Sequence, residues 1–273
     1  MFGTEQYSFV FLFCIIPYAA NIVNFLGYPA YLDGPRQSAD RPAGVLRTLL
    51  SAVSQSLRRR RLRRLLVESM GYEGLFRSSR DYIQPVIRAA CLSLPLMLVL
   101  GDRLNLGQGQ RVAIGVGAVY FALHLLGSLA SRGAGGFARK FGGEDRSARW
   151  LWMLNLAVFA LMAGGILAGL PPLTIAAFVL LAVFQNFWRP ILVGRVASHA
   201  DSAQTATVLS IESQAKSIFI AVIAPLLGWT VDLVTVYHHD LRFLPIAALG
   251  IVISASMLLT GRGAFRSHDD GNQ

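Results

Sequence analysis

The chain has 273 residues, of which 54% are hydrophobic and only 15% charged, and its mean hydropathy is +0.50. A soluble domain carries about a quarter charged residues, and here the deficit falls in charge-free runs long enough to cross a bilayer. The net charge of +10 would suit nucleic acid only on an exposed soluble surface. We therefore expect no nucleic-acid partner and take the lipid bilayer as the surroundings. Cys14 and Cys91 both lie in apolar segments, which disfavours a disulfide framework.

The first apolar run extends from Gln6 to Leu32 without a charge. Its length predicts a membrane span over about Tyr7–Tyr28. The run is too long for the core of a cleaved signal peptide, so we expect the span to be retained. Residues 1–31 form the first unit of the predicted organisation.

A basic segment follows over residues 32–81. Leucines recur at helical spacing from Leu46 to Leu57 and lead into the arginine-rich run Arg58–Arg64. This pattern predicts a cytoplasmic loop with an amphipathic helix on the membrane surface, its arginines among the lipid headgroups. Two interpretations stay open, a loop that only fixes the topology and a lipid-regulated switch.

Residues 82–260 are predicted to form a bundle of six further spans, followed by a polar cytoplasmic tail at 261–273. The uncharged run Trp150–Trp188 would make a helix about 60 Å long, twice the thickness of a membrane. We expect it to break at Gly169 and Pro171–Pro172 into a helical hairpin. The fold class is thus an all-α, multi-pass transmembrane bundle of about seven spans. Besides this hairpin, the later spans are Tyr82–Gly101, Val112–Ser131, Thr205–Val231 and Phe243–Thr260.

The basic residues indicate how the chain is oriented. Alternating the seven spans puts 20 of the 25 basic residues on one side and three on the other. Basic loops stay in the cytoplasm. We therefore predict an inner or plasma membrane protein with its N-terminus outside and its C-terminus in the cytoplasm. Arg88 is expected at the cytoplasmic end of the second span, from where its side chain reaches the headgroups.

Two charged residues lie inside the sixth predicted span. Glu212 and Lys216 are four positions apart, so they share a helix face and can pair. An ionisable side chain within a span costs about 2.5–3.5 kcal/mol on insertion scales, so both should face the bundle interior. They form either a substrate or proton-coupling site, or a structural ion pair, and both interpretations stay open.

Other candidates are polar residues in the remaining spans. His124 lies in the middle of the third span and either carries a proton or packs as a neutral histidine. Gln185 and Asn186 end the fifth span and are candidates for lining a cavity. The loop Tyr237–Asp240 contains adjacent histidines, which seldom bind one ion together. Without a catalytic motif in the sequence, we predict no enzyme, metal site or cofactor.

The stretch from Gln185 to Asp232 has a distinctive order of residues: Arg189-Pro190, then Ala206–Ser210, then Pro225 with Gly228, then Asp232. In this it resembles the tenth and eleventh helices of major facilitator superfamily transporters. Thr205 replaces an arginine of the family pattern, so we expect no ion pair from that position.

The resemblance extends in order over nearly the whole chain. It implies that the seven spans correspond to family helices six to twelve and that residues 32–81 are the central loop. The glycine-rich segment Gly133–Gly143 is similar to the basic loop between helices eight and nine. By that likeness, Gly133, Arg139 and Lys140 are candidates for a gating loop.

The function implied is transport of a small solute by the C-terminal half of a secondary carrier. The substrate site of such a carrier lies between two halves. The expected partner is therefore a missing N-terminal half or a second chain, and the chain alone is not expected to complete a transport cycle. The alternative is a membrane scaffold or lipid-surface protein that works through the arginine-rich run Arg58–Arg64.

Overall fold

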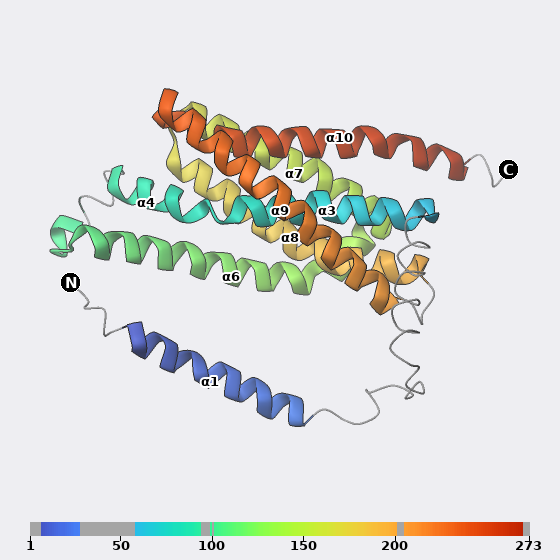
Figure 1. Ribbon diagram of the computed structural model, residues 1–273, viewed down its shortest axis with the longest axis horizontal. Helices are drawn as coiled ribbons and strands as arrows, with labels where there is room; N and C mark the ends of the chain where they lie inside the picture. The colour runs from blue at the N-terminus through green and yellow to red at the C-terminus, as the bar shows by residue number, and fades with distance from the viewer. Residues whose placement is uncertain (1–6, 28–57, 94–98, 100, 201–204, 270–273) are drawn as a thin grey trace. The chain divides into compact units, whose positions relative to one another are not determined.

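The computed structural model describes residues 7–27, 58–93, 99, 101–200 and 205–269, and Figure 1 shows its helices. The described residues contain helices and turns and no strand, which confirms the predicted all-α class. The chain divides into two compact units, Met1–Leu49 and Leu50–Gln273. The leucine-rich part of the predicted amphipathic helix, Leu46–Leu57, lies outside the described residues.

The described part of the first unit is helix α1, Tyr7–Leu26, which coincides with the predicted first span. Its 20 residues contain no charge, and Pro17 lies within it. The helix ends at Leu26, and the amide of the following turn residue Gly27 donates to the carbonyl oxygens of Val23 and Asn24.

The second unit is a bundle of helices joined by short turns. Gly169 adopts a positive φ of 63° between α7 and α8, as glycine readily does, and α8 begins with a proline, which suits a first helical turn. This confirms the predicted hairpin and its break. Gly142 and Gly143, with φ of 79° and 105°, make the corresponding turn between α6 and α7. The helices are α3 Arg60–Arg80, α4 Ile83–Ser93, α6 Gln108–Lys140, α7 Glu144–Leu167, α8 Pro171–His199, α9 Thr205–Tyr237, the 3-10 turn η3 His239–Leu241, and α10 Leu244–Asp269.

Helix α3 corrects the predicted surface loop. It packs against α8, α9 and α10 and buries apolar side chains such as Leu62, Leu65 and Tyr72. The five consecutive residues 71–75 are all buried, so the middle of α3 is enclosed by the bundle on more than one side. After a turn at Asp81 and Tyr82 the chain continues as α4, which extends α3 in Figure 1. The predicted boundary between residues 81 and 82 therefore falls inside a pair of helices that both belong to the bundle.

Two further segments differ from the prediction because helices continue through them. Helix α6 extends to Lys140, so Gly133, Arg139 and Lys140 lie on its last turns rather than in a loop. The rings of Phe137 and Phe187 are in contact there, tilted by 34° with centroids 5.0 Å apart, which fixes this end of α6 against α8. Helix α10 continues to Asp269, whereas a polar tail was expected from residue 261 onward.

Helices α7 and α8 form the centre of the bundle. Within their apolar stretches 44% and 39% of residues are buried, against 11% for both α6 and α9. Among the described residues, five helices are long and apolar enough to cross a membrane: α6, α7, α8, α9, and η3 together with α10 up to Thr260. This agrees with the predicted helical membrane protein. Within the described part of the second unit, broad faces of α6 and α9 are uncovered.

The contact between α7 and α10 gives a packing prediction. A Cβ atom at Gly250 would overlap the ring of Phe159, which is fully buried. We expect Gly250→Ala to lower the free energy of unfolding by about 1–3 kcal/mol through overpacking. The control is Gly164→Ala in α7, where a Cβ meets nothing within 4 Å, and which should be neutral or stabilising by about 0.5–1 kcal/mol. Unfolding in detergent micelles measures both, and equal effects would contradict the packing.

Candidate functional site

Four charged side chains meet between α3, α8 and α9, and we call them the four-charge cluster: Glu73, Arg189, Glu212 and Lys216. The Lys216 ammonium donates to Glu73 at 2.5 Å and to Glu212 at 3.0 Å. The Arg189 guanidinium donates to Glu73 at 3.1 Å and to Glu212 at 2.9 Å. The Ser69 hydroxyl also donates to Glu212. Each carboxylate thus has two cationic partners.

The cluster is electrically balanced and mostly buried. The side chains of Glu73, Glu212 and Lys216 are at most 3% exposed, whereas that of Arg189 is 42% exposed. Buried charges are tolerated when they are paired and fully hydrogen-bonded. The predicted Glu212–Lys216 pair is therefore present, but as half of a larger network with one member open to the surface.

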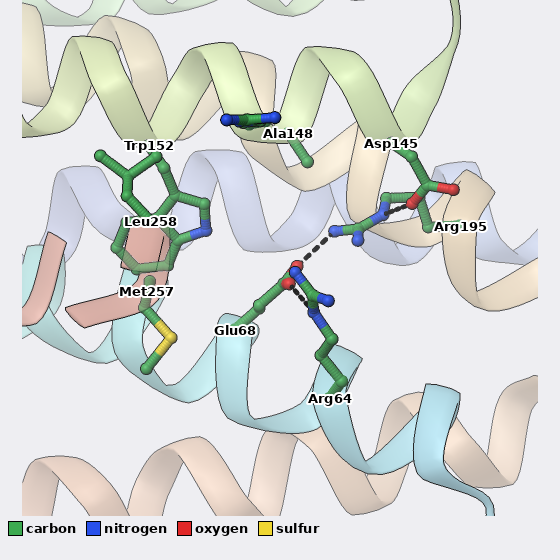
Figure 2. Close-up of a pocket in the computed structure, with 9 residues that line it drawn as sticks. Arg64, Glu68, Asp145, Ala148, Trp152, Arg195, Met257 and Leu258 are labelled. Atoms are coloured by element: carbon green, nitrogen blue, oxygen red, sulfur yellow. Dashed lines mark hydrogen bonds and ion pairs between the residues drawn. The ribbon is translucent and has the colours of Figure 1, made fainter. Parts of the chain in front are cut away.

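A second cluster joins α3, α7 and α8, and Figure 2 shows it: Arg64, Glu68, Asp145 and Arg195. The Arg195 guanidinium donates to Glu68 and to Asp145, each at 2.7 Å. Arg64 donates to the other oxygen of Glu68, also at 2.7 Å. Like the first cluster, it holds two positive and two negative charges. It fixes the beginnings of α3 and α7 to the end of α8.

A small cavity of about 20 Å³ lies beside this second cluster. Figure 2 shows the indole nitrogen of Trp152 on the side of its ring that faces Glu68 and Arg195, and this buried nitrogen has no hydrogen-bond partner. Such a volume holds about one water molecule. The cavity is too small for a transported solute, so this region serves to hold helices together.

The five predicted pathway residues take different places. Lys216 and Glu212 are in the four-charge cluster, but His124 is exposed on α6. Asn186 is partly buried on α8, and its amide donates to the carbonyl oxygen of Ala182 at 2.8 Å. Gln185 is next to it with a buried oxygen that has no hydrogen-bond partner. The structure therefore does not bring the predicted residues into one site.

The carboxylates of α3 were not among the site residues predicted from the sequence. Glu68 and Glu73 lie in the segment expected to be a loop, and each binds an arginine of α8 more than a hundred residues away. The available signal was two acidic residues within a leucine-rich stretch of helical period. Their partners are Arg189, which was named from the sequence only in the motif Arg189-Pro190, and Arg195, which was counted only among the cytoplasmic charges.

Helix α6 exposes two contrasting stripes. Tyr120, His124 and Ser128 follow each other at intervals of four residues and so share one face, on which His124 and Ser128 are exposed and Tyr120 is partly buried against the core. A neighbouring stripe is apolar and exposed, and consists of Ile114, Phe121, Leu125 and Leu129. One uncovered helix surface is therefore polar along one line and apolar along the next.

Helix α9 has the same division. Ser210, Ser213, Gln214 and Ser217 are all exposed and lie on one face by their spacing. The adjoining exposed stripe is apolar, with Ile218, Val222, Leu226, Trp229 and Leu233. We call the polar lines on α6 and α9 the polar stripes.

Comparison with known proteins gives no relative: no family model, no curated protein and no solved structure matches the chain. The described residues also contain no group of three or more histidine, cysteine or acidic side chains placed to hold a metal ion. The function must therefore be inferred from the chain's own residues.

Proposed function

We propose that the chain is part of a transmembrane carrier for a small solute, equivalent to the C-terminal half of a major-facilitator-like transporter. In this proposal α1 and the α3–α4 pair add two spans to the five apolar helices. The N-terminus lies outside and the C-terminus lies in the cytoplasm of an inner or plasma membrane, as the bias of basic residues favours.

The observation that carries the proposal is the polar stripes on α6 and α9. Lipid chains cover apolar surface at no cost, whereas polar side chains within a span usually face a bundle interior or a water-filled cavity. Only 11% of the residues in the apolar stretches of these two helices are buried, and the polar stripes lie mostly on their exposed faces. They suit one wall of an aqueous path whose other wall is a second bundle.

The four-charge cluster fits a carrier as a contact that holds α3, α8 and α9 together at one end of the path. Arg189 bridges two buried carboxylates while part of its side chain stays exposed. Exchange of such a bridge for another partner is one way in which a helix pair acquires two discrete arrangements. The cluster thus has a structural role in every state and a gating role if its pairing changes.

Cysteine labelling in native membranes tests the aqueous path. In a chain with Cys14 and Cys91 replaced by alanine, His124→Cys and Ser217→Cys place thiols on the polar stripes. Their neighbours provide matched controls, since Leu125→Cys and Ile218→Cys lie on the apolar stripes of the same helices.

Only a thiolate reacts with a membrane-impermeant methanethiosulfonate, and thiolates form in water, so the stripe cysteines should react at least ~10-fold faster than their neighbours. Equal rates within both pairs would contradict a path along these helices. A scaffold that works through its arginine-rich run has no need of such a difference.

A further inference from the structure

A charged face runs along α3 and α4, and we call it the arginine face: Arg77, Arg80, Asp81, Gln84 and Arg88. These residues recur every three or four positions, so they share one side of the helix pair, and all of them are exposed. Arg77 and Arg88 make no hydrogen bond or ion pair with another described residue. Arg80 approaches Asp81 only at 4.0 Å.

Contacts with α9 show at which level along the bundle the arginine face lies. Glu73, one turn before Arg77, is paired with Lys216. Tyr82, directly after Asp81, lies against Gly228, with its hydroxyl 3.7 Å from the Cβ position of that glycine. Arg80 therefore lies level with the part of α9 between Lys216 and Gly228, which contains no charged residue.

Contacts with α6 give the same level independently. Gln84 donates to the Tyr120 hydroxyl at 3.4 Å, and Tyr120 lies near the middle of the charge-free stretch Val112–Ser131. Cys91 contacts the Cβ position of Gly115, closer to the start of α6. Since α4 and α6 run in opposite directions, Arg80 lies one turn beyond Gln84, level with the part of α6 near His124 and still close to the middle of the stretch.

This position changes the expectation for Arg88. It was predicted at the cytoplasmic end of a span, but it lies between Gln84 and Cys91 and hence toward the beginning of α6. In the predicted orientation that is the outer end. The four-charge cluster around Glu73 marks the opposite end, so the arginine face extends between the two.

An exposed guanidinium at this depth requires compensation. A charge facing lipid at the middle of a span costs several kcal/mol by any scale, whereas water or an opposite charge removes that cost. The face carries three arginines and one aspartate, an excess of two positive charges. Gly117, on the same stripe of α6 as Tyr120, leaves open space, since a Cβ there would meet nothing within 4 Å.

We propose that the arginine face binds the carboxylate or phosphate group of a small anionic solute. This inference rests on the carrier function proposed above and names its substrate class. Arginine binds such groups through two parallel hydrogen bonds. Arg80 is the central contact, and Gln84 and Tyr120 contribute neutral hydrogen bonds that orient the solute.

Thermal unfolding of the full chain in detergent tests the proposal. Succinate and inorganic phosphate are the anionic probes, glucose and choline are the neutral and cationic ones, and chloride keeps the ionic strength equal. We expect succinate or phosphate, but neither glucose nor choline, to raise the Tm. Arg80→Gln should weaken the apparent affinity by about 10- to 100-fold, the equivalent of a charged hydrogen-bond pair.

Two further variants distinguish a loss of anion binding from a loss of folding. Arg80→Lys should retain part of the anion effect, because it keeps the charge and loses the forked geometry. Arg139→Gln, at the exposed end of α6, should retain all of it. Because Arg80 is 57% exposed, the variant chains should fold as well as the wild type when no probe is present.

Three results would overturn the anionic class: no shift with either anion, the same shift in Arg80→Gln, or a larger shift with choline or glucose. Failure of the anion-binding proposal can be distinguished from failure of the carrier proposal. If the stripe cysteines react and neither anion binds, the aqueous path is supported and the proposed substrate class is wrong. If those cysteines stay unreactive, the carrier proposal fails first.

Discussion

Replacing Lys216 by methionine should lower the free energy of unfolding by about 3–5 kcal/mol, the cost of leaving a buried charge without its partner. Lys216 is 3% exposed and contacts both carboxylates of the four-charge cluster. Without it, Glu73 and Glu212 share Arg189 alone and the cluster has one unbalanced negative charge.

A second substitution should rescue this loss. In Lys216→Met with Glu73→Gln, the remaining Glu212 and Arg189 are balanced again, and we expect more than half of the stability to return. The matched control is Lys140→Met, since Lys140 is the other lysine of the chain and is exposed at the end of α6; it should change stability by less than about 0.5 kcal/mol. Chemical unfolding in micelles gives these values and that of Glu73→Gln alone. Simple additivity of the two cluster substitutions would show that the charges do not act together.

Loss of Arg195 should have an effect of similar size, about 3 kcal/mol, at the second cluster. Its side chain is 8% exposed and binds Glu68 of α3 and Asp145 of α7. Arg195→Met therefore removes the ion pairs that join α8 to both other helices. Glu68 then keeps only Arg64, which is partly exposed.

Adding Glu68→Gln to Arg195→Met should restore much of this stability, because a neutral amide replaces the uncompensated carboxylate. Arg146→Met removes an exposed arginine of α7 and serves as the control with little expected effect. Proteolysis from the cytoplasmic side of membrane vesicles offers a second measurement, since α3 should become more accessible only in the single variant. Unchanged unfolding in Arg195→Met would mean that the cluster contributes nothing to the packing.

Local patterns in the sequence predicted what local physics determines. The apolar helices, the break at Gly169 and Pro171, and the pairing of Glu212 with Lys216 each depend on residues a few positions apart. The partners Glu73 and Arg189 are 116 residues apart, and no spacing rule connects them. Distant ion pairs of this kind become visible only when helices are packed together.

The error at α3 has a particular cause. The many arginines at its beginning were taken as the mark of a loop, and the carboxylates that neutralise arginines of α8 were not weighed. Several charged residues of this chain are buried, so a charge alone does not indicate that a segment is exposed. The glycines near the end of α6 were likewise taken as the mark of a loop. Gly133 instead lies inside the helix, which the contact between Phe137 and Phe187 holds against α8.

If the chain is part of a carrier, water reaches polar side chains along helices that otherwise face lipid. The most direct measurement is the ratio of labelling rates of cysteines at positions 124 and 125 by a charged thiol reagent in sealed native vesicles. The carrier account predicts a ratio of ~10 or more, because one thiol meets water and the other hydrocarbon. A ratio near one would contradict it.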